Sequence, residues 1–257
     1  MEIIDFNAHP GYNFHKVNHG VDIDIPLFAK DLKACDITKV CGSYINVDVN
    51  CRPLNEYEKI IPELNRKAYE VKEMLGDFYV PGIHVHPDFK ELSCCEIEKY
   101  AAKGVKLIGE LVPYMMHFND KCAEHNFIEI MECAAFYGMV VNVHPVSAAH
   151  MHKVSDEIPK NLTFVWAHLY GYGGYDDHIE MMKKHENIYF DISAHGTDKV
   201  GIISDAVNKV GSERLLFGTD YPGVGPASDF AAVMFENITD ADRENIFYRN
   251  AKRLLEI

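Results

Sequence analysis

Residues 3–10 read IIDFNAHP, an apolar run that is too short for a helix and breaks into polar residues and a histidine. Such a run predicts a buried strand that ends at a functional site. Because side chains two residues apart point to the same side of a strand, we expect Asp5, Asn7 and His9 to share one face. Three polar groups on one face of an apolar strand need partners, and later strands must supply them.

The sequence then alternates between short apolar runs and helical patterns. Eight strands are expected, at residues 3–6, 39–45, 78–85, 105–111, 139–143, 162–167, 188–192 and 215–218. Helical patterns lie between and after them, at residues 25–35, 54–75, 92–102, 120–137, 148–158, 175–185, 198–210, 227–236 and 240–255. Continuous apolar strands that alternate with helices are typical of a parallel sheet covered by helices.

Eight such units fit the size of one (β/α)8 TIM barrel. The expected fold class is therefore α/β, with residues 1–257 forming a single barrel domain. A doubly wound open sheet is the alternative, but it is disfavoured because no glycine-rich phosphate loop follows the first strand.

The charge balance argues against polyanionic partners. The chain has 25 Lys and Arg against 39 Asp and Glu, and this net charge of −14 repels phosphate backbones and anionic membranes. We therefore expect a small-molecule substrate, no nucleic-acid partner and no membrane contact, while a homo-oligomer is compatible with the sequence. The first strand starts too near Met1 for a signal peptide, and the seven cysteines include no C-x-x-C pair, so we expect a cytoplasmic protein with free thiols.

Polar residues, mostly histidines and carboxylates, stand where the predicted strands end, which is where the active site of such a barrel lies. They are Asn7 and His9 after the first strand, His86 after the third, Glu110 in the fourth, His144 after the fifth, His168 after the sixth, His195 beyond the seventh and Asp220 after the eighth. Imidazole and carboxylate groups together suit a divalent metal ion. Zinc is the expected ion, and manganese is the alternative if oxygen ligands predominate.

The order of these motifs resembles the amidohydrolase superfamily. The resemblance rests on Asn7-x-His9, on His144-Pro145, on His168, and on RLLFGTDYP at residues 214–222, of which the last is the most specific. The closest branch is amidohydrolase-2, which includes metal-dependent hydrolases and nonoxidative decarboxylases. The closing helix, with NAKRL at residues 250–254, also resembles that branch.

The resemblance implies a role for each motif residue. His9 and His144 would bind the metal, Asp220 would lie at the metal and handle protons, and His168 would orient or activate the bound water. Asn7 departs from the His-x-His or Glu-x-His that the family usually carries, and an amide oxygen is a weaker ligand. Glu110, which sits where TatD-like nucleases of the same superfamily place a metal-bridging glutamate, would compensate.

These considerations give a predicted site. The metal ligands are Asn7, His9, Glu110, His144 and Asp220, the catalytic residues are His168 and Asp220, and the substrate-side candidates are His86, Lys106 and His195. Lys106 has a second interpretation, because it precedes Glu110 by four residues, on the same side of a regular strand, where the two would form an ion pair.

The function expected is that of a metal-dependent hydrolase that acts on a small carboxylic ester, lactone or amide. A bound divalent ion lowers the pKa of its water from 15.7 to about 7, which supplies hydroxide at neutral pH. Three alternatives remain open: a nonoxidative decarboxylase of a small carboxylic acid, a TatD-like metal-dependent nuclease, and a degenerate barrel that only binds because Asn7 has disabled the site.

Overall fold

The computed structural model describes residues 1–13, 22–171, 174–194, 197 and 199–257. Eight strands form one sheet in chain order, and each pairs in parallel with the next. They are β1 (Ile4–Asp5), β2 (Lys39–Ser43), β3 (Tyr79–Ile83), β4 (Leu107–Leu111), β5 (Val140–Val143), β6 (Phe164–Trp166), β7 (Ile188–Asp191) and β8 (Leu215–Leu216). The strands are one to three residues shorter than predicted, and their positions agree. The predicted (β/α)8 barrel is confirmed.

Backbone hydrogen bonds between the first and last strand regions close the barrel. Phe6 N donates to Phe217 O at 2.8 Å, and Asp220 N donates to Asn7 O at 2.7 Å. Beyond them, Ala8 and Tyr221 form a parallel bridge. The segments after β1 and β8 are therefore held side by side.

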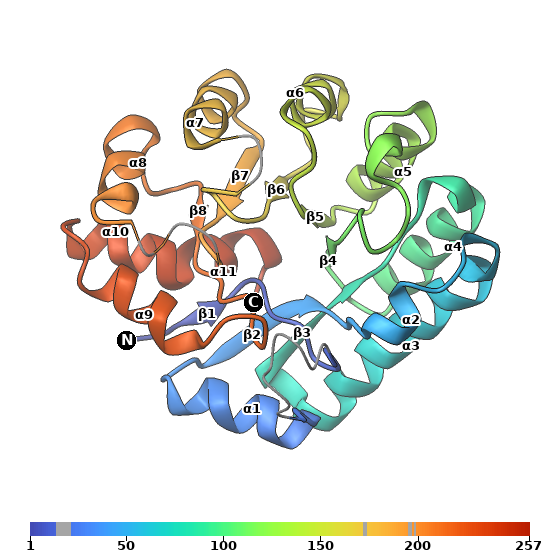
Figure 1. The fold of residues 1–257 in the computed structure, drawn as a ribbon, viewed down its shortest axis with the longest axis horizontal. Helices are drawn as coiled ribbons and strands as arrows, with labels where there is room; N and C mark the ends of the chain where they lie inside the picture. Colours follow the sequence, from blue (N-terminus) through green and yellow to red (C-terminus); the bar gives the residue numbers. More distant parts are fainter. Residues whose placement is uncertain (14–21, 172–173, 195–196, 198) are drawn as a thin grey trace.

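Helices surround the strands on the outside (Figure 1). They are α1 (Ile25–Ala34), α2 (Val47–Asn50), α3 (Tyr57–Leu75), α4 (Lys90–Ala101), α5 (His125–Phe136), α6 (Ala148–Glu157), α7 (Tyr175–Lys184), α8 (Ile202–Val210), α9 (Pro226–Met234), α10 (Asp240–Glu244) and α11 (Asn250–Leu255). Asp24 caps α1, since its Oδ1 accepts from Leu27 N at 2.8 Å. Within the described ranges, no helix combines the length and the apolar character that a bilayer crossing requires.

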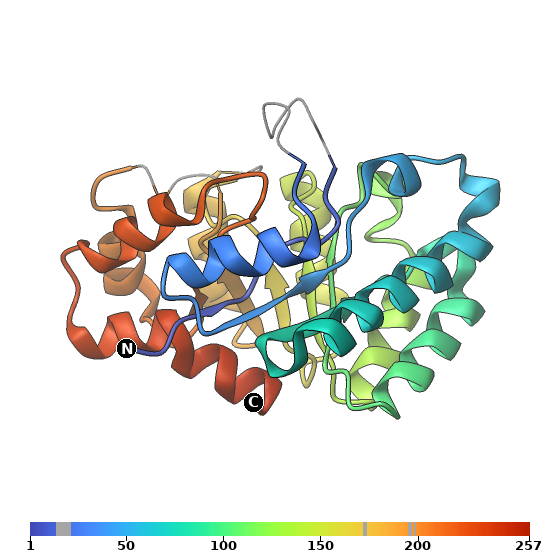
Figure 2. The same cartoon turned by 90° about the horizontal axis from the view of Figure 1, so that it is seen from below.

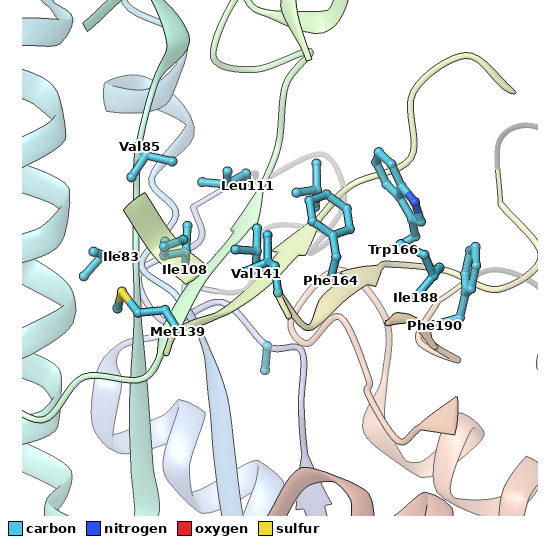
Figure 3. Close-up of a cluster of buried hydrophobic side chains, with 14 of the residues drawn as sticks. Ile83, Val85, Ile108, Leu111, Met139, Val141, Phe164, Trp166, Ile188 and Phe190 are labelled. Atoms are coloured by element: carbon cyan, nitrogen blue, oxygen red, sulfur yellow. The ribbon is translucent and has the colours of Figure 1, made fainter. Parts of the chain in front are cut away.

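Apolar side chains fill both faces of the sheet. The larger cluster packs between the strands and the helices, and Figure 3 shows its part along β3 to β7: Ile83, Val85, Ile108, Leu111, Met139, Val141, Phe164, Trp166, Ile188 and Phe190. A smaller cluster takes residues from the opposite face, such as Ile4, Leu107 and Val165, together with Leu255 of α11. Helix α11, red in Figure 2, lies along the lower edge there.

The helix predicted at residues 240–255 is interrupted. A π-helical segment, Asn245–Arg249, separates α10 from α11. This wider turn coincides with hydrogen bonds to β8 and to the residue that follows it: Asn250 Nδ2 donates to Leu215 O at 2.8 Å, and Ile246 O accepts from Phe217 N at 3.0 Å. Tertiary hydrogen bonds of this kind do not show in a 3.6-residue periodicity.

Candidate metal centre

Five predicted site residues converge at the carboxyl ends of the strands. His9 follows β1, Glu110 lies in β4, His144 follows β5, His168 follows β6 and Asp220 follows β8. The first four are buried, whereas the side chain of Asp220 is 26% exposed. His168 and Asp220 also hold left-handed backbone conformations, with φ of 58° and 56°, which are costly for residues other than glycine and concentrate at functional sites.

Glu110 is the centre of this cluster. Its Oε1 lies 2.8 Å from His144 Nδ1 and 3.5 Å from His168 Nε2. Its Oε2 lies 3.1 Å from His9 Nε2, and that nitrogen is in turn 3.2 Å from Asp220 Oδ1. Each carboxylate oxygen therefore faces a separate group of potential ligands, one with His144 and His168 and one with His9 and Asp220.

A bulge in β4 turns Glu110 toward the centre. The pairing of β4 with β5 shifts register between Ile108 and Leu111, and both of these side chains lie in the outer apolar cluster. In a regular strand, residues three apart point to opposite faces, so one extra residue is accommodated here. Gly109 allows it, because its φ is +92° and a Cβ there would lie 2.0 Å from the carbonyl oxygen of Asn142.

Backbone carbonyls orient two of the imidazoles. His9 Nδ1 is 3.3 Å from Ser43 O, and His168 Nδ1 is 3.1 Å from Ser193 O. A carbonyl can only accept, so each Nδ1 carries the proton and each Nε2 points into the cluster. This is the support that metal-binding histidines commonly have.

The cluster favours positive charge. Burial would lower the pKa of His9, but its hydrogen bonds to Asp220 and Glu110 outweigh burial and raise this pKa to about 10. Burial likewise opposes protonation of His168, yet Glu110 raises its pKa to about 10. The pKa of Glu110 is held well below its usual range, since the imidazoles of His168, His144 and His9 outweigh the effect of burial.

This donor set fits a divalent cation. Three imidazoles and two carboxylates supply nitrogen and oxygen ligands of the kinds that zinc and manganese accept. Two of the rings are already orientated from outside the cluster, and the potential ligand atoms of each group lie within 4.8 Å of one another. His9, Glu110, His144 and Asp220 are the residues that would hold the cation.

Asn7 joins the cluster through its amide nitrogen. Nδ2 donates to Glu110 Oε2 at 2.8 Å and to Asp191 Oδ2 at 3.2 Å. The side chain thus presents a donor to Glu110, whereas the sequence interpretation had its oxygen facing a metal. Asp5 is a support between strands, because Oδ2 accepts from Thr219 Oγ1 at 2.6 Å and Oδ1 from Asn7 N at 3.1 Å.

Two of the three substrate-side candidates lie away from the cluster. Lys106 precedes β4 at the opposite end of the barrel, where its Nζ lies 2.9 Å from Glu256 Oε2. It does not pair with Glu110, because the β4 bulge breaks the alternation on which that prediction relied. His86 has both nitrogens engaged, with Nε2 2.8 Å from Met116 O and Nδ1 accepting from Asp88 N. His195 is outside the described residues.

A cavity of about 450 Å³ adjoins the cluster at His144. It is lined by Tyr114, Asn119, Asp120, His144, Pro145, Val146, Ser147 and His150. The ring of Tyr114 meets the His144 ring edge-on, with centroids 5.1 Å apart. The volume suits a small organic molecule, and aromatic and polar groups are available to contact it.

Sequence reasoning missed the residues that support the cluster. Asp191 at the end of β7 is fully buried and accepts from Asn7, Asn142 Nδ2 (3.3 Å), Ser193 Oγ (2.5 Å) and His168 N (3.1 Å). The only signal in the sequence is a carboxylate at the end of an apolar strand. Its partners are up to 184 residues away along the chain, so the sequence alone gave no reason to select it.

The chain resembles known proteins over most of its length. A family model described as Amidohydrolase (Amidohydro_2) matches residues 63–257. A gamma-resorcylate decarboxylase from Polaromonas sp. (strain JS666 / ATCC BAA-500) is 37% identical over 74 residues, which cover 28% of this chain and only 22% of that relative.

Solved structures of similar fold include two decarboxylases. A 2,6-dihydroxybenzoate decarboxylase from Rhizobium has a TM-score of 0.77 at 14% identity, covering 100% of this chain and 99% of its own. A dihydroxybenzoic acid decarboxylase from Polaromonas sp. JS666, with bound manganese and the inhibitor 2-nitroresorcinol, has a TM-score of 0.75 at 14% identity, covering 99% and 97%. At this identity the similarity establishes the fold alone.

Proposed function

The chain belongs to the amidohydrolase family, and on that premise we propose that it is a divalent-metal-dependent, nonoxidative decarboxylase of a small hydroxylated aromatic acid. The observation that carries the proposal is the convergence of three imidazoles and two carboxylates beside a cavity of about 450 Å³. The partial match to gamma-resorcylate decarboxylase and the fold shared with two dihydroxybenzoate decarboxylases favour this chemistry over hydrolysis. Manganese, which one of those structures contains, is the preferred ion.

The proposed reaction exchanges a carboxyl group for a proton. The bond between the ring carbon and the carboxyl carbon breaks, its electron pair stays on the ring carbon, and one proton is delivered there while CO2 leaves. A divalent cation held by His9, Glu110, His144 and Asp220 would supply the positive charge that attracts and orients the carboxylate and the neighbouring hydroxyl oxygen of the substrate.

Two residues can manage the proton. Asp220 is the exposed member of the cluster, so its carboxyl group can exchange protons with solvent and with a substrate held at the cation. His168 is fully enclosed and its ring is fixed by Ser193, which suits it to hold a proton and to keep the substrate oriented. We assign proton delivery to Asp220 and proton storage to His168.

The cavity provides the binding surface. Tyr114 offers an aromatic edge next to His144, and Ser147 caps α6, whose first turn faces the cavity. A flat aromatic acid can place its carboxylate at the cluster and its ring beside Tyr114. Burial of the ring in this way excludes water from the carbon that accepts the proton.

The test is a paired substrate panel on the Mn²⁺-loaded protein. Dihydroxybenzoates and related aromatic acids are assayed for CO2 release, and lactones, esters and amides of similar size are assayed for hydrolysis. In D2O, decarboxylation should place one deuterium on the ring carbon that carried the carboxyl group. The Asp220→Asn variant, which cannot deliver the proton, is the control and should lose at least about 10²-fold in turnover.

Hydrolysis is the second candidate, because each oxygen of Glu110 faces its own ligand group. Such an arrangement is compatible with two cations and a water between them, which is a hydrolytic design. Hydrolysis of a lactone or amide without CO2 release from any aromatic acid would refute the decarboxylase proposal. Failure of the purified protein to bind Mn²⁺ or Zn²⁺ would instead favour a barrel that only binds.

A further inference from the structure

Two buried asparagines donate to the same carboxylate oxygen. Asn7 Nδ2 and Asn142 Nδ2 lie 3.2 and 3.3 Å from Asp191 Oδ2. Both side chains are fully enclosed, and neither amide oxygen receives a hydrogen bond from the part of the chain that the structure describes. With respect to Asp191, the two residues are a matched pair.

They differ in their other contacts, because Asn7 Nδ2 also donates to Ser193 Oγ at 3.3 Å and bonds to a member of the cluster directly. Asn7 Nδ2 also donates to Glu110 Oε2 at 2.8 Å, the shortest of its hydrogen bonds, whereas no such bond joins Asn142 to Glu110 in the described residues. The direction of this amide is set by its surroundings. If it were turned over, its oxygen would face the oxygens of Glu110 and Asp191, and those contacts would become repulsive.

The amide nitrogen of Asn7 is therefore hydrogen-bonded to Glu110 and Asp191, while its amide oxygen is left without a donor. A buried acceptor with no donor costs free energy. The orientation of Asn7 is maintained because the hydrogen bonds from its nitrogen to two carboxylates stabilise it by more than this cost. We propose that Asn7 is a positioning residue, which fixes the carboxylate of Glu110 through its amide nitrogen and does not bind the metal through its oxygen.

The proposal rests on the metal centre proposed above, and it explains how that centre keeps its shape. Glu110 has three torsion angles between its backbone and its carboxylate. The bond from Asn7, which is itself held by Asp191, limits their rotation, so that one oxygen stays toward His9 and the other toward His144. Groups that orient metal ligands in this way usually contribute about 10- to 100-fold to metal affinity.

The experiment measures Mn²⁺ affinity by competition with a chelator in the full-length wild type, Asn7→Ala, Asn142→Ala and Asn7→Asp. Asn7→Ala is expected to weaken Mn²⁺ binding by about 10- to 100-fold. Asn142→Ala removes an equivalent bond to Asp191 but none to Glu110, so it should stay within about threefold of wild type, because no proposed metal ligand loses a partner. The absorption spectrum of the Co²⁺-loaded protein should change in Asn7→Ala and not in Asn142→Ala.

The Asn7→Asp variant distinguishes a positioning role from a ligand role, because the two roles predict opposite changes in Mn²⁺ affinity. It keeps the shape of the side chain but replaces the donor with an acceptor beside Glu110, so a positioning role predicts weaker binding. A ligand role predicts tighter binding, because a carboxylate is a stronger ligand than an amide. This variant also decides the question if Asn7→Ala fails to fold.

Two outcomes overturn the inference alone: wild-type Mn²⁺ affinity in Asn7→Ala, or tighter Mn²⁺ binding in Asn7→Asp. Wild-type protein that binds neither Mn²⁺ nor Co²⁺ would overturn the inference and the proposed function together. The two failures are therefore distinguishable.

Discussion

Replacing Glu110 with glutamine should release the proton that His168 holds in the metal-free protein. The pKa of His168 rises from 6.5 to about 10, which corresponds to roughly 5 kcal/mol in favour of the imidazolium. Burial acts against this rise, so nearby negative charge must supply it, and Glu110 is the leading source, ahead of Asp220 and Asp191. Glutamine keeps the volume of the side chain and removes the charge. The pKa of His168 should then fall by at least about 2 units.

Nuclear magnetic resonance titration of the histidine ring signals, after removal of metal by a chelator, measures this change directly. A matched control is Glu96→Gln, since Glu96 is also buried but lies on α4, bonded to Asn65 and Lys99. This control should leave the His168 titration unchanged. The reasoning is refuted if wild-type His168 titrates at or below 6.5, or if it still titrates near 10 in Glu110→Gln.

Four further outcomes follow from the same geometry. His144→Ala and Asp220→Ala should each lose Mn²⁺ binding while the fold persists, and unchanged metal stoichiometry in both would contradict their assignment as ligands. His168→Ala should keep Mn²⁺ but lower turnover by roughly 10²–10⁴-fold in the CO2 assay; complete loss of metal would identify it as a ligand. The folded-state pKa values of His9 and His168 are raised to about 10. The protonated imidazoles therefore stabilise the metal-free protein fully below pH 6.5, and this stabilisation is lost as pH rises toward 10. The thermal unfolding temperature at pH 10 should accordingly be at least about 4 °C lower than at pH 6.5, and this difference should be smaller in His168→Ala. Lys106→Ala should leave KM within about twofold of wild type, since surface ion pairs such as the one with Glu256 contribute little. A large rise in KM would show that Lys106 contacts the substrate.

The barrel and the convergence of its site were predictable because both depend on local patterns. Each strand shows as a short apolar run, each helix as a 3.6-residue repeat, and parallel strands bring their carboxyl ends together whatever the side chains are. His9, His144, His168 and Asp220 therefore meet where their positions in the sequence placed them.

The direction of individual side chains was not predictable, because it depends on contacts between distant segments. Asn7 faces Glu110 with its nitrogen only because Asp191, 184 residues away, lies on the same side. His86 looked available at a strand end, but its Nε2 lies 2.8 Å from the carbonyl oxygen of Met116, 30 residues away in the chain. The break before α11 likewise follows from hydrogen bonds to β8.

Because of the bulge in β4, the direction of the Glu110 side chain depends on how many residues lie between Ile108 and Leu111, and not only on the residue types. If the same residues formed a regular strand, Glu110 would point to the same face as Ile108, into the helix layer, and Leu111 would leave the outer apolar cluster. Alignments that match this strand by its hydrophobic pattern can consequently place the glutamate one column away from a functionally equivalent residue. A relative that lacks the extra residue is expected to keep a glutamate in its metal centre only where that glutamate directly follows the residue that corresponds to Ile108.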